Sequence, residues 1–523
     1  MTMGSSKRLP NITRRAMLAG TAAIGGSLVL PAQARAQAPQ PTTGGTLRVA
    51  MPYNPAALDP LTGRNNPDFN TLFAIYDALI DFDPNTLELK PMLAKSWTFT
   101  DPTTLVLELV EGVEFHDGEP FNAEAVVFHL ERCMNYARSN VKSDVASIDK
   151  VEATGPYQVT IRTKHPDASL PAALSDRPGC IVSPKSVKEA ADGNVDRNPV
   201  GTGPFKFVEW RDNDLIKVEK NTNYWQDGQP YLNAIEFRII NELNTAARTV
   251  MAGQSDVALN LAAQQIAIAR RDENVVAEAT PSLIYYTSFL NYAEGPLSDV
   301  RIRQAMNWAL NREDLNRVLV LGLGQGHCSM FPTGFWANDP ETENYYTHDL
   351  DRAKKLLAEA GVPNGVEIQT WSWPDQAAVQ RQEVISSQLA QAGIRLKVTP
   401  VPPAQAMQNF LDEKKGHQLL SPTGGLPDPS ITYDRQFSGN AYRNAGKIEL
   451  PGFRELMDAS LSTFEPEPRQ KVIYRMQRFV LENALHLPQY MSASMTVRTP
   501  RLHEFVFGLL NRPKFHKVWL EQA

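Results

Sequence analysis

The chain has 523 residues, too many for one ordinary hydrophobic core, because such cores stop growing at about 250–300 residues. We therefore expect two or more lobes. Hydrophobic residues make up 42% of the chain and charged residues 21%, as in an ordinary folded, soluble protein. No interior stretch of the sequence approaches the roughly 18 uninterrupted apolar residues of a membrane-spanning helix, which argues against an integral membrane protein.

The N-terminal segment has the pattern of an export signal. Basic residues that include the adjacent Arg14 and Arg15 precede an apolar run of small residues. The paired arginines resemble the twin-arginine address, and the alternatives are an ordinary Sec signal or an uncleaved membrane anchor. Cleavage near Ala36 or Ala38, where small residues suit a signal peptidase, would make residues 1–38 a signal peptide.

Cleavage would make the protein more acidic. Residues up to Ala36 carry five basic side chains and no acidic ones, so their removal moves the formal net charge from −6 to −11. Nucleic acids and anionic membranes attract clustered Lys and Arg, so we expect neither as a partner. The cysteines, Cys133, Cys180 and Cys328, are too few for a zinc site or a disulfide scaffold. A Cys133–Cys180 bridge is the alternative to free buried thiols, and we expect no cofactor and no metal.

Strand patterns recur throughout the chain. A linker at 39–45 leads into a strand at 46–51, whose alternation puts Leu47, Val49 and Met51 on one face. Further strands are predicted at 105–110, 158–163, 215–219, 234–240, 366–371 and 394–398.

Helical patterns lie between these strands. One helix follows a predicted cap at Asn122, a second runs over 300–310, and a third over 353–360 ends at Gly361. Strands mixed with helices, without an internal repeat, predict an α/β protein of several lobes.

One motif resembles catalytic machinery but is better explained as a turn. His116-Asp117 ends a strand and runs into Gly118 ahead of the predicted helix cap, where Asp-Gly turns are common. The sequence also has no Gly-x-Ser-x-Gly or His-Glu-x-x-His motif of a hydrolase.

A second motif, Gly201-Thr202-Gly203, resembles a phosphate-binding loop only superficially. The Lys-Ser/Thr pair of such loops is missing, and Pro204 interrupts the entry into any helix. We predict a tight turn in which glycine allows a close chain crossing.

Several short blocks occur in a characteristic order over nearly the whole mature chain. They are Gly44-Gly45-Thr46-Leu47-Arg48-Val49-Ala50, Leu58-Asp59-Pro60, Leu93-Ala94-Lys95-Ser96-Trp97, residues 113–123, Val200-Gly201-Thr202-Gly203-Pro204-Phe205, Asn223-Tyr224-Trp225, residues 300–305 and 309–312, residues 353–361, and Leu426-Pro427-Asp428-Pro429. In order and spacing they resemble the family 5 extracellular solute-binding proteins of ABC importers, the group that includes peptide-, nickel-, glutathione- and opine-binding proteins.

The resemblance implies an α/β, three-lobed periplasmic-binding-protein fold of type II, cluster C-like, with the ligand cleft between lobes I and III. The chain is expected to cross between these lobes near 283–289 and near 495–499. The expected parts are the signal peptide at 1–38, lobe I at 43–78, 204–284 and 497–523, lobe II at 79–203, and lobe III at 285–496.

Aromatic and polar residues near strand ends are the candidate ligand-binding residues. In Trp371-Ser372-Trp373 the strand period sends both indoles to one face, where they either hold an apolar or planar ligand group or pack in the core. Asp428 would hold a cationic group unless it only fixes its turn, and Arg435 would hold a carboxylate. The full set, with no catalytic residue and no metal ligand, is Tyr53, Asn54, Trp371, Trp373, Asp428, Tyr433, Arg435 and Tyr490.

The implied function is that of a periplasmic binding protein, acting as a monomer. It would capture a small ligand such as a peptide, an opine or a related amino-acid conjugate, and hand it to the transmembrane subunits of an ABC permease. The alternatives are a secreted hydrolase, which needs a nucleophile–base pair in the cleft, and a chemoreceptor accessory protein or chaperone.

Two departures from the family pattern narrow the range of ligands that we expect. Peptide-binding members resemble one another in an aspartate three positions before the acidic residue of the proline turn, where this chain has Gly425. Nickel-type members place a histidine soon after that turn, where Ser430 and Thr432 stand. Simple peptides and bare nickel are therefore disfavoured, and carboxylate-bearing conjugates such as opines are favoured, with Arg435 as the expected clamp.

Overall fold

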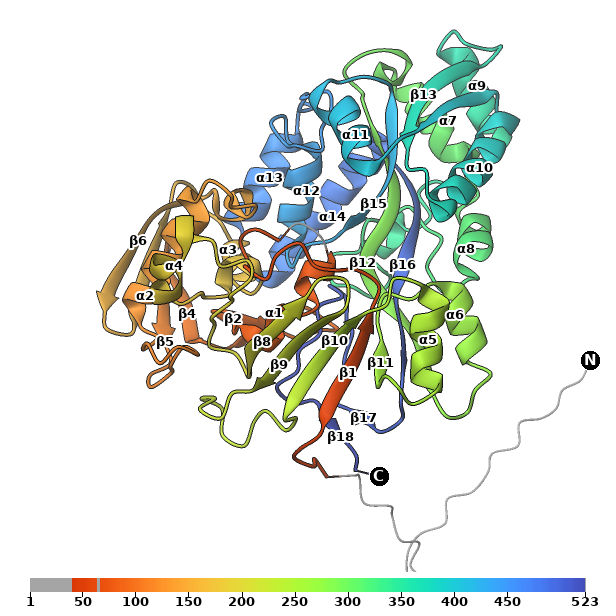
Figure 1. Ribbon diagram of the computed structural model, residues 1–523. Helices are drawn as coiled ribbons and strands as arrows, with labels where there is room; N and C mark the ends of the chain where they lie inside the picture. Colours follow the sequence, from red (N-terminus) through yellow and green to blue (C-terminus); the bar gives the residue numbers. More distant parts are fainter. Residues whose placement is uncertain (1–39, 64–65, 523) are drawn as a thin grey trace, which may run out of the picture. The chain divides into compact units, whose positions relative to one another are not determined.

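A ten-stranded sheet of mixed parallel and antiparallel pairs runs through the described part of the chain, in the order β14-β13-β15-β12-β16-β11-β1-β10-β9-β8 (Figure 1). The computed structural model describes residues 40–63 and 66–522, so the predicted signal peptide lies outside the described residues. Within these residues no helix is both long and apolar enough to cross a bilayer. Helices pack on the sheet, and the predicted α/β class is confirmed.

The strands of this sheet agree with the sequence patterns to within two residues wherever both exist. Their bounds are β1 (Thr46–Met51), β8 (Phe205–Arg211), β9 (Leu215–Lys220), β10 (Ala234–Ile239), β11 (Val257–Ala258), β12 (Val276–Leu290), β13 (Val366–Ser372), β14 (Ile394–Pro400), β15 (Gln418–Gly424) and β16 (His486–Arg498).

The first half of the sheet is built around β1, which pairs in parallel with β10 on one side and β11 on the other. Leu47, Val49 and Met51 are fully buried in the main core, as their alternation predicted. Ala50 points the other way, into a smaller cluster formed with helices α5 (Leu243–Met251) and α6 (Ala263–Ala269).

The second half contains β13, β14 and β15, which pair in parallel. Gly361 ends one of its helices with a φ of +82°, as the C-terminal glycine pattern predicted. The helices of this half are α7 (Val300–Ala309), α8 (Arg312–Val320), α9 (Leu350–Glu359), α10 (Gln376–Gln391), α11 (Pro403–Met407), α12 (Pro429–Phe437), α13 (Phe453–Ser462) and α14 (Pro466–Glu482).

The long antiparallel strands β12 and β16 belong to both halves. Their pairing runs from Val276 opposite Arg498 to Phe289 opposite His486. The register shifts between Pro281 and Tyr285, so the ladder is interrupted midway along both strands. The chain passes from one half of the sheet to the other at this interruption.

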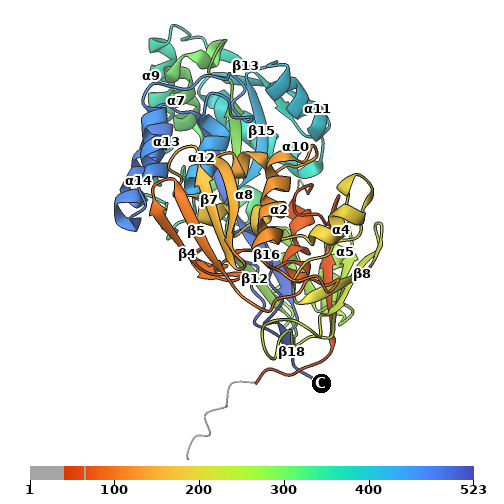
Figure 2. The ribbon, with the colours of Figure 1, turned by 90° about the vertical axis from the view of Figure 1, so that its left-hand side faces the viewer.

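A separate four-stranded antiparallel sheet has its own hydrophobic core (Figure 2). The predicted cap is present, since the Asn122 side chain accepts a hydrogen bond from the Ala125 N–H at 3.0 Å. The elements of this region are β4 (Ala94–Asp101), β5 (Thr104–Leu109), β6 (Ile148–Gly155), β7 (Gln158–Thr163), α2 (Ala123–Asn135), α3 (Leu170–Ala173) and α4 (Pro184–Glu189). Small elements elsewhere are α1 (Leu72–Ile75), β2 (Ile80–Phe82), β3 (Leu89–Pro91), β17 (Leu502–His503) and β18 (Trp519–Leu520).

The Gly201-Thr202-Gly203 segment is the close chain crossing that the sequence predicted. A Cβ atom at Gly201 or Gly203 would lie 2.3 or 2.6 Å from the carbonyl oxygen of Ile75, too close for any side chain. Beside it the buried Asp77 accepts hydrogen bonds that pin the crossing. The donors are Thr202 Oγ1 at 3.3 Å, Tyr224 OH at 3.1 Å and Trp225 Nε1 at 2.8 Å.

His116 and Asp117 also belong to this crossing and do not face each other as a catalytic pair. His116 Nε2 lies 2.9 Å from the carbonyl oxygen of Gly203, and Asp117 accepts a 2.6 Å hydrogen bond from Ser183 Oγ. Burial lowers the pKa of His116 to about 4, so the ring is neutral in the folded protein at pH 7. The cysteines Cys133, Cys180 and Cys328 are buried free thiols, as expected.

The half-buried, neutral His116 predicts a pH dependence of stability. Because its folded pKa lies below the unfolded value of about 6.5, the unfolded chain binds the extra proton between these pH values, and stability falls as the pH is lowered through this window. His116→Gln should remove up to about 1.4 kcal/mol per pH unit of this slope, measured by denaturant unfolding between pH 7 and 4. His165→Gln, at an exposed position, is the matched control; an unchanged slope in His116→Gln would contradict the account.

Candidate functional site

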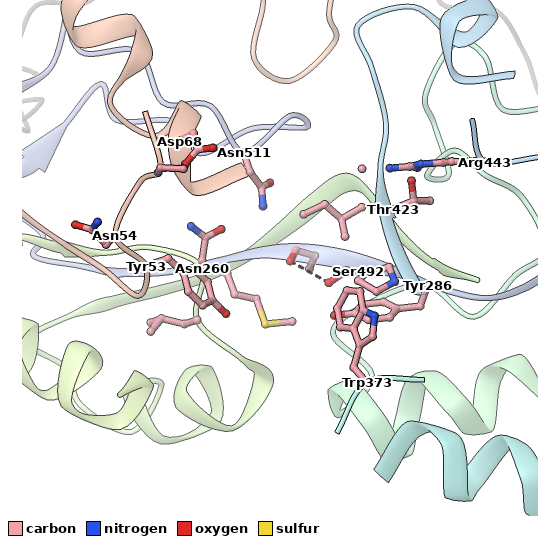
Figure 3. A pocket seen from close by; sticks show the side chains of 17 residues that line it. Tyr53, Asn54, Asp68, Asn260, Tyr286, Trp373, Thr423, Arg443, Ser492 and Asn511 are labelled. Atoms are coloured by element: carbon pink, nitrogen blue, oxygen red, sulfur yellow. Dashed lines mark hydrogen bonds between the residues drawn. The ribbon is translucent and has the colours of Figure 1, made fainter. Parts of the chain in front are cut away.

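A cavity of about 640 Å³ lies where the carboxyl ends of parallel strands from the two halves of the large sheet meet (Figure 3). Tyr53 follows β1 and Asn260 follows β11, whereas Trp373 follows β13 and Thr423 lies at the end of β15. Side chains that follow parallel strands gather at one edge of a sheet, which is the usual ligand position in such folds. The cavity therefore draws its walls from both halves.

The wall of the cavity also contains residues from the middle of β12 and β16, where the pairing of these two strands is interrupted. They lie between the residues contributed by the two halves of the sheet. Ile284 and Tyr286 come from β12, and Ser492, Ala493 and Met495 come from β16. The cavity thus lies at the point where the chain crosses between halves. A change in the angle between the halves would change its width.

An aromatic group forms one side of the cavity. The rings of Tyr286 and Tyr490 stack with centroids 4.7 Å apart and an interplanar angle of 21°. The guanidinium carbon of Arg381 lies 4.6 Å from the Tyr286 ring centroid. Trp373 adds a second ring system to the wall. Such surfaces suit planar or apolar ligand groups.

Three of the residues predicted from sequence line this cavity: Tyr53, Asn54 and Trp373. Tyr53 is 56% exposed, so it is available for contact. The Asn54 side chain is already engaged, because its Oδ1 accepts hydrogen bonds from Trp210 Nε1 at 3.2 Å and from the Asn213 N–H at 3.0 Å.

Trp371 packs beside the cavity and does not line it. Its Nε1 donates to the Lys415 carbonyl at 2.6 Å, and its indole covers Gly416. Both tryptophans pack against the same small core cluster, as the strand period predicted, but β13 ends at Ser372 and only Trp373 reaches the cavity.

Asp428 and Tyr433 lie outside the cavity for separate reasons. Asp428 caps α12 through the Ser430 N–H at 2.8 Å, and its two oxygens accept hydrogen bonds from Arg469 at 2.7 and 2.8 Å. Asp428 therefore fixes its own turn, which is the second of the two roles that the sequence allowed for it. Tyr433 is fully buried, with its ring against Phe331.

Arg435 and Tyr490 also lie outside the cavity lining. Arg435 forms an ion pair with Asp144, so its guanidinium already has a partner within the protein. Tyr490 is 4% exposed and contributes only by supporting Tyr286. The cavity lining therefore does not include five of the predicted residues: Trp371, Asp428, Tyr433, Arg435 and Tyr490.

The sequence patterns did not indicate Tyr286, Arg443, Asn260 or Thr423, which line the cavity. The Asn260 Nδ2 and Thr423 Oγ1 atoms are buried and have no hydrogen-bond partner among the described residues, and the same holds for Trp373 Nε1. Arg443 stands in a loop rich in Gly and Asn at 438–446, which gave no periodic signal. Together these residues add hydrogen-bonding side chains and one cation to the aromatic wall of the cavity. No group of three or more His, Cys, Asp or Glu side chains that could hold a metal occurs in the described residues.

Comparisons with known proteins agree on one family. The model of the bacterial extracellular solute-binding proteins, family 5 Middle, matches residues 88–444. The glutathione-binding protein GsiB of Shigella flexneri serotype 5b (strain 8401) is 30% identical over 363 residues, 68% of this chain and 70% of that protein. GsiB of Escherichia coli O157:H7 is 30% identical over 365 residues, with the same two shares.

Solved structures agree in fold. The periplasmic binding protein DppA from Helicobacter pylori in complex with the peptide STSA gives a TM-score of 0.81 at 23% identity, covering 92% of this chain and 99% of that one. AgaA from A. tumefacien R10, in complex with agropinic acid, gives a TM-score of 0.80 at 22% identity with the same coverage.

Because Asp428 accepts two hydrogen bonds from Arg469, replacing Arg469 should lower the stability of the protein strongly. Arg469→Met would leave a buried carboxylate unpaired and should lower the free energy of unfolding by about 3–5 kcal/mol, measured by denaturant titration. Arg454→Met, which breaks a more exposed pair with Glu449, should cost about 1 kcal/mol or less. Equal effects of the two substitutions would contradict the structural role of Asp428.

Proposed function

This chain belongs to family 5 of the bacterial extracellular solute-binding proteins, and on that premise we propose that its cavity captures a small solute for an ABC-type importer. Binding proteins of such importers take up small ligands and work with the membrane permease. The observation that carries the proposal is the cavity of about 640 Å³ between the two halves of the large sheet, whose wall combines aromatic residues such as Tyr286 and Trp373 with polar residues such as Asn260.

We propose that capture occurs by closure of the two halves of the large sheet about the interruption in β12 and β16. The register shift between Pro281 and Tyr285 weakens the ladder beside Ile284 and Ser492, which line the cavity. A break in regular pairing concentrates bending in a few residues. Only the closed form would present the surface that the permease recognises.

The proposed solute is a peptide, an opine or a related amino-acid conjugate. Support comes from the relatives, which are named for glutathione, or were solved with a peptide or with agropinic acid. A cavity of about 640 Å³ lies within the range usual for small-molecule sites. Gly425 packs against Leu283, where a Cβ would be only 2.5 Å from the Leu283 Cβ, so this position has no room for an acidic side chain.

We propose binding without catalysis. Among the described residues that line the cavity there is no histidine and no cysteine, so the nucleophile–base pair that a secreted hydrolase needs has no support there. We also propose export to the periplasm, with residues 1–38 removed and action as a monomer, in keeping with the extracellular family.

The proposed function predicts a ligand-dependent increase in stability. The protein without residues 1–38 is melted with glutathione, dipeptides, opines and, as an unrelated class, sugars. A true ligand at about 100 times its Kd should add about 2.7 kcal/mol of stability. Failure of every amino-acid derivative to shift the melting temperature, with a shift by a sugar, would contradict the proposed solute class.

The same measurement locates the ligand through a matched pair of tryptophans. Trp373→Ala should weaken binding by about 1–3 kcal/mol, a 5- to 150-fold change in Kd, because its ring lines the cavity. Trp371→Ala should leave the Kd unchanged and lower stability instead, because Trp371 packs in the wall behind. A reversed pattern would place the ligand elsewhere.

A further inference from the structure

Arg443, unlike Arg435 and Arg469, forms no ion pair with a carboxylate of the described residues. Its side chain extends into the cavity, with the guanidinium end toward the open centre (Figure 3). Within residues 40–63 and 66–522, no carboxylate pairs with this guanidinium and no oxygen accepts a hydrogen bond from it. Its guanidinium carbon lies 5.5 Å from the centroid of the Phe289 ring.

An arginine in this position is costly unless something compensates it. The guanidinium stays charged in proteins, so it cannot escape the cost by losing its proton. Burial lowers the pKa of Arg443, and the charge of the nearby Arg435 lowers it further. A half-buried charge such as that of Arg443 is less well solvated than one on the open surface, and a ligand anion compensates it as it binds.

The surroundings of the same wall add positive charge. Arg381 is 5% exposed, and its Nε and Nη2 atoms have no hydrogen-bond partner in the described part of the chain. Its guanidinium carbon lies 4.6 Å from the centroid of Tyr286, which lines the cavity. This wall therefore repels a ligand ammonium and attracts a ligand anion.

The acidic side chain on the cavity wall does not neutralise Arg443. Asp68 lies across the cavity from Arg443 in Figure 3, and its Oδ1 accepts a 2.8 Å hydrogen bond from the Ala56 N–H. No ion pair joins Asp68 to Arg443. Arg435, which the sequence suggested as a clamp, pairs with Asp144 and is not available for this role.

We propose that Arg443 is the specificity-determining residue of the cavity and binds a carboxylate of the solute. The proposal rests on the capture function above and narrows it to anionic amino-acid derivatives. A carboxylate is favoured over a phosphate dianion because Arg443 is the only cation that lines the cavity among the described residues, and one guanidinium balances one negative charge. Two coplanar carboxylate oxygens also match the two-pronged donor.

The first test needs no ligand. Arg443→Gln removes an uncompensated charge, so the ligand-free variant should melt at the same temperature as the parent or higher. If Arg443 instead stabilised the fold, the substitution would lower the melting temperature. A melting temperature lowered by the substitution in the absence of ligand would overturn the proposal.

The second test uses opines and dipeptides, each as the free acid, as the primary amide at the carboxylate, and as the phosphonate analogue. Calorimetric titration should show the acid binding roughly 10- to 150-fold more tightly than its amide. Arg443→Gln should bring the acid down to the affinity of the amide and leave the amide unchanged, and Arg443→Lys should restore part of the difference. Arg435→Gln is the matched control and should keep the full discrimination.

The outcomes separate this proposal from the capture function. If acids and amides bind the parent protein equally, or if Arg443→Gln weakens both equally, the solute is captured but Arg443 does not read its carboxylate. Tighter binding of the phosphonate than of the acid would likewise overturn the assignment of a carboxylate. If no compound binds and none is found bound to the purified protein, the capture function itself fails, and this inference fails with it.

Discussion

The pairing of β12 with β16 is the constraint on which the rest of the structure depends. These strands are neighbours in the middle of the large sheet, and their pairing joins the strands of one half to those of the other. Between Pro281 and Tyr285 the chain advances four residues on β12 while β16 advances two, from Ala493 to Met491. The extra residues bend the strand and turn Ile284 toward the cavity, as a β-bulge does beside many binding sites.

The backbone groups freed by this interruption are satisfied from outside the ladder. The Leu283 N–H donates to the Leu509 carbonyl at 2.8 Å, and the Leu283 carbonyl accepts from the Gly425 N–H at 2.8 Å. Ser282 Oγ bonds the Ser492 carbonyl at 3.1 Å. The interruption of the β12–β16 ladder is therefore part of the fold, because these backbone groups find hydrogen-bond partners outside the ladder. It also explains why position 425 holds glycine, since its backbone must approach Leu283 closely.

The sequence predicted those features that depend on local order, but it could not show which side chains have partners that are distant along the chain. Strand bounds, the Asn122 cap and the glycine crossing follow from local patterns and steric rules. The roles of Asp428 and Arg435 depend on Arg469 and Asp144, which are 41 and 291 residues away along the chain. No periodicity shows that these charges are already paired, or that Arg443 is left without a partner. The type of a residue suggests which ligand group it could bind, but only the fold determines whether its side chain is already paired within the protein.

The most direct test of the account is a crystal structure of the protein, without residues 1–38, in complex with a solute that stabilises it. The account predicts that the solute lies in the cavity between Tyr53 and Trp373, with a carboxylate within hydrogen-bond distance of the Arg443 guanidinium and the two halves of the sheet closed about the β12–β16 interruption. A solute bound outside this cavity, or one inside it with a cationic group against Arg443, would contradict the account.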